Sequence, residues 1–196
     1  MGILIIMPPD GRQRRRENLV ERLFCRALDL DGFGQSEERV MFYYEKALRL
    51  CPEHLMSLVN LGTIYFGRRQ FVVALEYYDR AIQTNPYYGL AHFNYASTLD
   101  ELGRREEALT SYQQAIYLGH TDAYYNLALL YQGTKRWMEA VACWQAYIKA
   151  DPLSMWAVVA RRELQLIRGK ILVKPVLSET AEVQFGGCNE IRFGKK

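Results

Sequence analysis

Small and large apolar residues alternate at helical spacing along most of the chain. Three alanines each stand four positions before a large aromatic residue. These pairs are Ala74 with Tyr78, Ala108 with Tyr112, and Ala140 with Trp144. Steps of three and four residues place side chains on one face of an α-helix. The pattern therefore predicts amphipathic helices that approach one another closely at the small residues.

The same pattern returns at a nearly fixed distance, which indicates internal repeats. The three alanines are separated by 34 and then 32 residues. Pro86, His120 and Pro152 follow the aromatic residues by eight positions, and a further copy with the same offsets ends at Pro52. A period of about 34 residues is typical of helix–turn–helix repeats. We therefore expect four copies of one structural unit.

Each of the last three copies has a second helix-forming half upstream of its alanine. A large residue precedes a small one at Leu61-Gly62, Tyr95-Ala96 and Leu127-Ala128. Glycines at Gly67, Gly103 and Gly133 separate this half from the alanine half. Glycine between two periodic segments is a turn signal. We therefore expect each copy to fold as two antiparallel helices.

This register resembles that of the tetratricopeptide repeat family, whose unit is a helix–turn–helix of about 34 residues. The copy with Leu61-Gly62, Tyr65 and Pro86 matches the family pattern best, whereas His120 stands where the family usually has proline. The resemblance implies an all-α fold, a right-handed α-solenoid of antiparallel helix pairs. The expected parts are a basic N-terminal arm (1–16), four repeats over 17–152 (17–52, 53–86, 87–120 and 121–152), a capping helix (153–168) and a C-terminal tail (169–196).

The capping helix is expected because a solenoid otherwise exposes the apolar face of its last repeat. In the range 153–168, Trp156, Val159 and Leu164 are the side chains expected to cover that face. Gly169 is expected to end the helix.

The two ends of the chain carry separate expectations. The tail contains short β-prone runs at 171–173 and 183–185. They predict a loose segment, or else a strand that docks on a neighbour or in the protein's own groove. The arginines within 12–16 predict a solvated arm. Contact of this arm with nucleic acid or with an acidic protein is the alternative.

Composition and charge refine this picture. Most of the 14 tyrosines are explained as side chains packed between helices, since Tyr buries a large ring while its hydroxyl stays hydrated. The formal net charge of +3 is too balanced to indicate nucleic-acid binding by itself. Residues 27–160 hold 11 basic and 15 acidic side chains, so an acidic body stands between basic ends.

No catalytic or metal-binding motif is present in the sequence. The four cysteines include no Cys-x-x-Cys pair, and the three histidines have no ligand spacing. Phosphate-loop, Gly-x-Ser-x-Gly and His-Glu-x-x-His motifs do not occur. The apolar run 3–7 is too short for a secretory signal, and no stretch reaches the roughly 20 apolar residues of a membrane span. We expect a cytoplasmic protein that is not an enzyme, with no cofactor, metal or membrane association.

One polar column points to a binding site. Asn60, Asn94 and Asn126 hold the same place in three successive repeats. The resemblance implies that these positions face the concave groove, where a carboxamide can donate to and accept from the backbone of an extended peptide. A purely structural role of these asparagines is the alternative. The other residues expected to line the peptide-binding groove are Val59, Thr63, Phe66, Phe93, Ser97, Tyr125 and Leu129.

Basic pairs recur at the turn inside three repeats, at Arg68-Arg69, Arg104-Arg105 and Lys135-Arg136. Cations near a helix C-terminus stabilise the helix by about 0.3–1 kcal/mol each, which accounts for them without a ligand. A stripe that binds an anionic partner is the alternative. The family's clamp of Lys and Arg for a C-terminal carboxylate is not supported. The matching positions here are Met56, Val59, Leu90, Phe93, Asp122 and Tyr125.

These observations predict a protein–protein interaction scaffold that binds an extended peptide or helix of another protein, with nucleic acid disfavoured as a partner. The resemblance leaves open a bacterial secretion-type chaperone or a repeat module of a transcription-regulatory complex. Self-assembly through the tail or the first repeat is a further alternative. The expected state is a monomer or a weak homo-oligomer.

Overall fold

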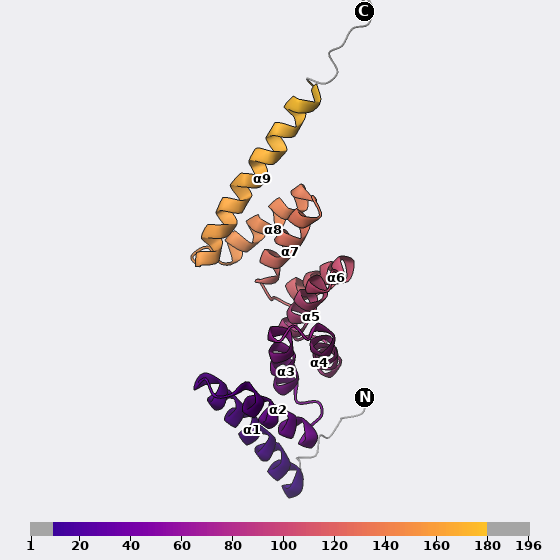
Figure 1. The fold of residues 1–196 in the computed structure, drawn as a ribbon, viewed down its shortest axis with the longest axis vertical. Coiled ribbons are helices and arrows are strands. Elements are labelled where there is room, and N and C mark those ends of the chain that lie inside the picture. The colour runs from indigo at the N-terminus through magenta and orange to yellow at the C-terminus, as the bar shows by residue number, and fades with distance from the viewer. Residues whose placement is uncertain (1–9, 180–196) are drawn as a thin grey trace, which may run out of the picture.

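The protein is described by a computed structural model that covers the backbone of residues 10–179 and the side chains of residues 10–170. Every regular element in this part of the chain is an α-helix. Figure 1 shows the helices stacked in sequence order along one long axis. The predicted all-α class and α-solenoid architecture are therefore confirmed.

Four helix pairs build the stack. They are α1 (Gly11–Gly32) with α2 (Glu37–Leu50), α3 (Leu55–Gly67) with α4 (Phe71–Thr84), α5 (Gly89–Glu101) with α6 (Arg105–Tyr117), and α7 (Ala123–Gly133) with α8 (Trp137–Ala150). The last three pairs fall inside the ranges 53–86, 87–120 and 121–152 derived from the sequence. A ninth helix, α9 (Met155–Glu179), follows the fourth pair and projects beyond the stack (Figure 1).

Buried aromatic rings from the second helix of each pair form the core. Tyr44, Tyr78 and Tyr112 are 1–2% exposed, and Trp144 has no exposed surface. The alanines four positions upstream of the last three rings are also completely buried. Small residues thus let the helices approach, and the rings fill the remaining space between them. The packing role predicted for these tyrosines is confirmed.

The turn inside each pair contains a residue in the left-handed backbone region. Glycine takes this place in the first and third pairs, where Gly34 and Gly103 have φ angles of 63° and 74°. Arg69 and Lys135 take it in the second and fourth pairs, with φ angles of 58° and 61°. A side chain in this conformation costs about 1–2 kcal/mol relative to glycine. The second and fourth turns are therefore strained where the first and third are not.

Replacing Lys135 by glycine is expected to stabilise the protein by about 0.5–1 kcal/mol, since removal of the strain outweighs the extra freedom of glycine in the unfolded chain. The free energy of unfolding from urea denaturation measures this. Lys135→Ala is the matched control, because it removes the same charge but keeps a Cβ in the left-handed conformation. A glycine variant no more stable than the alanine variant would contradict the strain.

The N-terminal end differs from the sequence-based expectation. The arm predicted for 1–16 is wrong from Gly11 onward, because α1 begins there and includes the arginines of 12–16. Asp10 caps the helix by accepting a hydrogen bond from the backbone N–H of Gln13 at 2.7 Å. Residues 1–9 lie outside the described part of the chain.

The C-terminal end also differs. Gly169 does not end the capping helix, which continues to Glu179 and includes the run 171–173. The run 183–185 lies outside the described residues. On the side of the stack, Ala157, Ala160 and Ile167 are completely buried, whereas Trp156, which was expected to cover the last repeat, is 59% exposed. None of the described helices is both long and apolar enough to cross a membrane.

Candidate functional site

A groove of about 420 Å³ runs across the second, third and fourth helix pairs. Its walls come mainly from α3, α5 and α7, the first helix of each pair. The residues of the sequence-derived set that line it are Thr63, Phe66, Phe93, Asn94, Ser97, Asn126 and Leu129. The tyrosines Tyr78 and Tyr112 and the acidic pair Asp100 and Glu101 also line it.

Three residues expected in the groove lie elsewhere. Val59 is 2% exposed and belongs to the core, so its assignment to the groove is wrong. Asn60 lies outside the groove lining and donates from Nδ2 to the hydroxyl of Tyr44 at 2.9 Å. Tyr125 lines a separate, smaller cavity near α9.

A hydroxyl network holds the polar part of the groove. Tyr78 donates to Thr63 Oγ1 at 3.2 Å, and Tyr112 donates to Ser97 Oγ at 3.1 Å. Asn126 Nδ2 lies 3.3 Å from both Ser97 Oγ and the Tyr112 hydroxyl. Burial raises the pKa of Tyr78 to about 12 and also raises that of Tyr112, so both rings remain protonated and can donate. The hydrogen bonds of Asn126 link the fourth repeat to the third through groove residues.

The three asparagines of the column are not equivalent in the folded protein. Asn60 and Asn126 each donate to the tyrosine hydroxyl of the preceding repeat. The tyrosine in the matching position for Asn94 is Tyr78, whose hydroxyl donates to Thr63 and accepts no hydrogen bond from Asn94. Within the described part of the chain, the carboxamide of Asn94 forms no hydrogen bond. It therefore offers both a donor and an acceptor at the groove.

The groove carries negative charge near the end of α5. Asp100 and Glu101 line it, whereas no Lys or Arg of the described residues does. Burial raises the pKa of Asp100, against the opposing effect of the nearby Arg105. Removing a carboxylate from water without an ion pair is unfavourable, so this side of the groove favours a cation.

Two rings hold Phe93 in the wall of the groove. Its centroid lies 6.0 Å from that of Tyr112 and 4.5 Å from that of His120. The His120 Nε2 atom is buried and has no hydrogen-bond partner within residues 10–170. Burial lowers the pKa of His120 and so favours its neutral form. His120 therefore acts here as an uncharged packing side chain.

Half of the basic stripe is paired within the chain. The ion pairs join Arg68 to Glu37 and Glu38, Arg104 to Glu107, and Arg136 to Glu139. Arg69 lies over the ring of Phe71, while Arg105 and Lys135 are exposed. Internal carboxylates thus offset much of the positive charge that an anionic partner would need.

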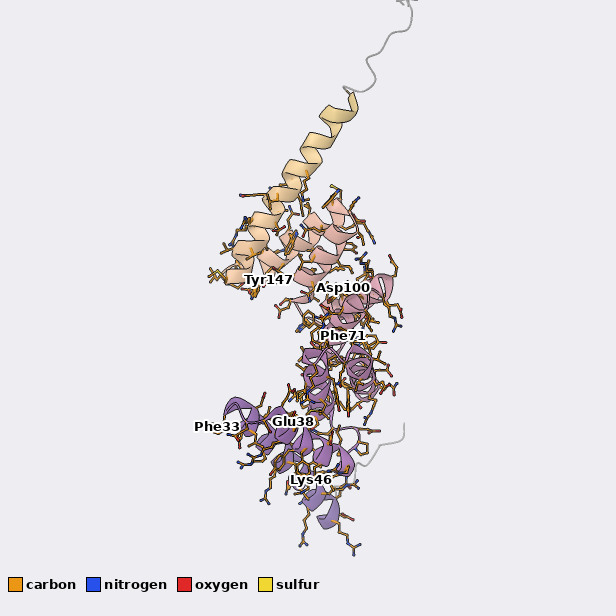
Figure 2. The ribbon with its side chains drawn as sticks, in the orientation of Figure 1. Phe33, Glu38, Lys46, Phe71, Asp100 and Tyr147 are labelled. Atoms are coloured by element: carbon orange, nitrogen blue, oxygen red, sulfur yellow. The ribbon has the colours of Figure 1, made fainter. Side chains whose placement is uncertain are left out.

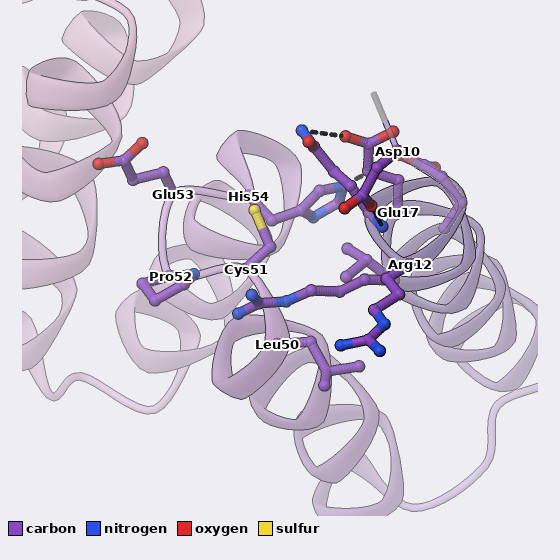
Figure 3. A pocket seen from close by; sticks show the side chains of 12 residues that line it. Asp10, Arg12, Glu17, Leu50, Cys51, Pro52, Glu53 and His54 are labelled. Atoms are coloured by element: carbon purple, nitrogen blue, oxygen red, sulfur yellow. Dashed lines mark hydrogen bonds and ion pairs between the residues drawn. The ribbon is translucent and has the colours of Figure 1, made fainter. Parts of the chain in front are cut away.

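A further cavity, of about 650 Å³, lies between α1 and the turn that follows α2. Figure 3 shows the capping residue Asp10 with Arg12 and Glu17 of α1 on one side, and Cys51 and His54 of the turn on the other. Side chains of both charges line it. Within the described residues, no cluster of three or more His, Cys, Asp or Glu side chains could hold a metal ion.

Two family models for the tetratricopeptide repeat match the chain. One matches residues 43–89 and 59–125, and the other matches residues 122–154. The general transcriptional corepressor ssn6 of Schizosaccharomyces pombe is 28% identical over 119 residues, which make up 57% of this chain and 10% of that protein. The chain spans 10–13% of the length of the curated relatives it matches.

Solved structures show the same fold. A tetratricopeptide repeat protein from Parabacteroides merdae has a TM-score of 0.66 at 24% identity, covering 85% of this chain and 68% of that one. The first repeat domain of Spaghetti (RPAP3), bound to the HSP90 peptide SRMEEVD, has a TM-score of 0.56 at 21% identity, covering 60% of this chain and 93% of that one. Repeats of this kind generally mediate protein–protein interactions and are typically non-catalytic scaffolds. With family matches across residues 43–154 and a stack of helix pairs in the same register, the chain belongs to the tetratricopeptide repeat family.

Proposed function

We propose that this protein is a non-enzymatic scaffold that binds an extended segment of a partner protein in the groove of α3, α5 and α7. The observation that carries the proposal is the unpaired state of the Asn94 carboxamide among the described residues. Its carboxamide lines the groove and forms no hydrogen bond within the described residues, whereas Asn60 and Asn126 donate to tyrosines. An amide that offers one acceptor and two donors suits the alternating N–H and C=O groups of an extended backbone.

The walls of the groove favour a segment with apolar and basic side chains. Phe66, Phe93 and Leu129 supply apolar surface, and Asp100 with Glu101 supplies negative charge. The peptide SRMEEVD of the RPAP3 structure has three acidic side chains, and like charges across an interface suppress binding. A basic segment is therefore the occupant that fits the groove of this chain.

The transcription-regulatory alternative has one supporting observation. The relative ssn6 is named a general transcriptional corepressor and matches more than half of this chain. A repeat module that binds basic segments of regulatory proteins would use the same groove. We further propose that the protein is cytoplasmic and is a monomer or a weak homo-oligomer.

Peptides selected by the full chain from a random display library test the proposal. We expect the selected peptides to be enriched in Lys or Arg. We expect Asn94→Ala to weaken their binding by about fivefold to tenfold, which corresponds to the net free energy of one or two hydrogen bonds. Isothermal titration calorimetry measures the affinities. Asn60→Ala is the matched control, because it removes a column carboxamide outside the groove. Equal affinity of wild type and Asn94→Ala, or tight binding of SRMEEVD, would count against the proposal.

A further inference from the structure

Three aromatic rings and a carboxylate surround a small cavity where the fourth helix pair meets α9. The cavity has a volume of about 190 Å³. Its lining residues are Asp122, Tyr125, Asn126, Tyr147 and Trp156. Figure 2 shows Tyr147 on the part of the stack next to the start of α9. Four elements thus converge on one cavity: the turn before α7, α7 itself, α8 and α9.

The ring of Tyr125 packs at a steep angle against each of the other two rings of the cavity. The centroid of Tyr125 lies 5.4 Å from that of Tyr147 and 5.5 Å from that of Trp156, with interplanar angles of 74° and 75°. Behind it, the buried Trp144 lies at 4.9 Å and 86°. Tyr125 is therefore held in place by rings on several sides. We call the cavity bounded by Asp122, Tyr125, Tyr147 and Trp156 the aromatic box.

Within the described residues, no cationic side chain of the chain occupies the aromatic box. Other rings of this chain are covered by its own basic side chains, with Arg136 at 4.5 Å from the Tyr131 centroid and Lys170 at 5.4 Å from that of Trp137. Among the described residues, no Lys or Arg lies over Tyr125, Tyr147 or Trp156. Trp156 is 59% exposed. A large indole wall thus stays open to a ligand.

Of the described residues that line the aromatic box, the charged one is acidic. Asp122 is exposed at its rim and forms no ion pair with any described residue. Glu163 of α9 accepts a hydrogen bond from Gln132 Nε2 at 3.1 Å, and the pKa of Tyr125 is raised first by burial and then by the charge of this glutamate. Aromatic faces add the negative end of their quadrupole. Both contributions favour a positively charged guest.

We propose that the aromatic box binds the alkylammonium group of a lysine side chain, bare or methylated, on a partner protein. The ammonium group would lie against the ring faces, with Asp122 as its counter-charge, which is the arrangement of cation–π recognition. Asn126 lines both the groove and the aromatic box. A segment that occupies the groove can therefore place a lysine in the box. Only this delivery rests on the proposed function, because the ammonium site itself needs no groove ligand.

Titration of the full chain with small cations tests the aromatic box. The ligands are tetramethylammonium, Nα-acetyl-lysine amide and Nα-acetyl-trimethyllysine amide. The neutral control is 3,3-dimethylbutanol, whose tert-butyl group has the shape of a trimethylammonium group without its charge. We expect the cations to shift the indole N–H resonance of Trp156 in ¹⁵N-correlated NMR spectra. The neutral control is expected to bind on the order of tenfold more weakly. The Trp137 resonance is the internal control, since Lys170 already covers that ring.

Variants separate the aromatic box from the groove. In the wild type we expect the cations also to shift the backbone amide resonances of α7, and we expect Trp156→Ala to abolish these shifts. Asp122→Asn should weaken binding of the cations severalfold and leave binding of the neutral control unchanged. Asn94→Ala should leave cation binding unchanged, so a failure of the groove proposal and a failure of this one give different results. Equal binding of the cations and the neutral control, or no shift at Trp156, would overturn the proposal. Binding of tetramethylammonium without either lysine derivative would overturn lysine as the source.

Discussion

Replacing Trp144 by alanine is expected to lower the free energy of unfolding by about 3–5 kcal/mol, the range for removing a large buried ring. This ring has no exposed surface. It packs 4.9 Å from the centroid of Tyr125 and donates from Nε1 to Gln132 Oε1 at 3.2 Å. Alanine leaves a cavity between α7 and α8 and removes the partner of the Gln132 amide oxygen. Urea denaturation followed by circular dichroism measures the loss.

The destabilisation caused by Trp144→Ala should be confined to one end of the helix stack. Each pair of a solenoid contacts only its neighbours, so the damage should stay near the fourth pair. We expect faster amide hydrogen exchange in α7, α8 and α9, with α1 to α4 unchanged. Trp156→Ala is the matched control, since an indole that is 59% exposed should cost about 1 kcal/mol or less. Equal losses in the two variants would contradict the assignment of Trp144 to the core.

The core and the order of the helices could be predicted from the sequence because burial follows periodicity. Ala74, Tyr78 and their equivalents recur at helical spacing and at a repeat distance, and a residue that recurs in this way occupies the same place in every unit. Part of the groove lining could be predicted for the same reason. Thr63 and Ser97 are equivalent positions, and both line it.

The hydrogen bonds of the groove could not be predicted in this way. Asn94 shares its register with Asn60 and Asn126, yet it alone of the three forms no side-chain hydrogen bond with the described residues. The Tyr78 hydroxyl donates to Thr63 and accepts no bond from Asn94, whereas the Tyr112 hydroxyl donates to the equivalent Ser97 and also accepts from Asn126. Such a choice depends on distances of a few tenths of an ångström, which a repeat pattern does not contain. The same limit applies to Tyr125, whose neighbour Trp156 comes from outside the repeats.

The ends of the chain show two further limits. Asp10 and Gln13 stand three residues apart, which is the spacing of a capping box, so the start of α1 had a signal in the sequence. Gly169, by contrast, was a misleading signal, because it predicted a helix end where the helix continues. One glycine inside a helix costs only about 1 kcal/mol relative to alanine, and that cost does not end the 25-residue helix α9.

Gly62→Ala is expected to destabilise the protein by about 1–3 kcal/mol, the usual cost of overpacking a core. Alanine is the better helix former by about 1 kcal/mol, so helix propensity alone predicts the opposite sign. A Cβ at this position would lie 2.5 Å from Cε1 and 2.8 Å from Cδ1 of Tyr78. That ring is 2% exposed, and its hydroxyl donates to Thr63. It has little room to move, so the clash should exceed the gain in propensity.

Two further variants decide whether the clash is the cause. Gly67→Ala, in the last turn of the same helix, adds a Cβ with no other atom within 4 Å, and should leave stability unchanged or raise it by up to about 1 kcal/mol. The double variant Gly62→Ala with Tyr78→Leu should lose less stability than the sum of the single losses, since the shorter side chain relieves the contact. Urea denaturation of wild type, Gly62→Ala, Gly67→Ala, Tyr78→Leu and the double variant measures both effects. A Gly62→Ala protein as stable as wild type would mean that the Tyr78 ring moves freely, and its groove hydroxyl would then move with it.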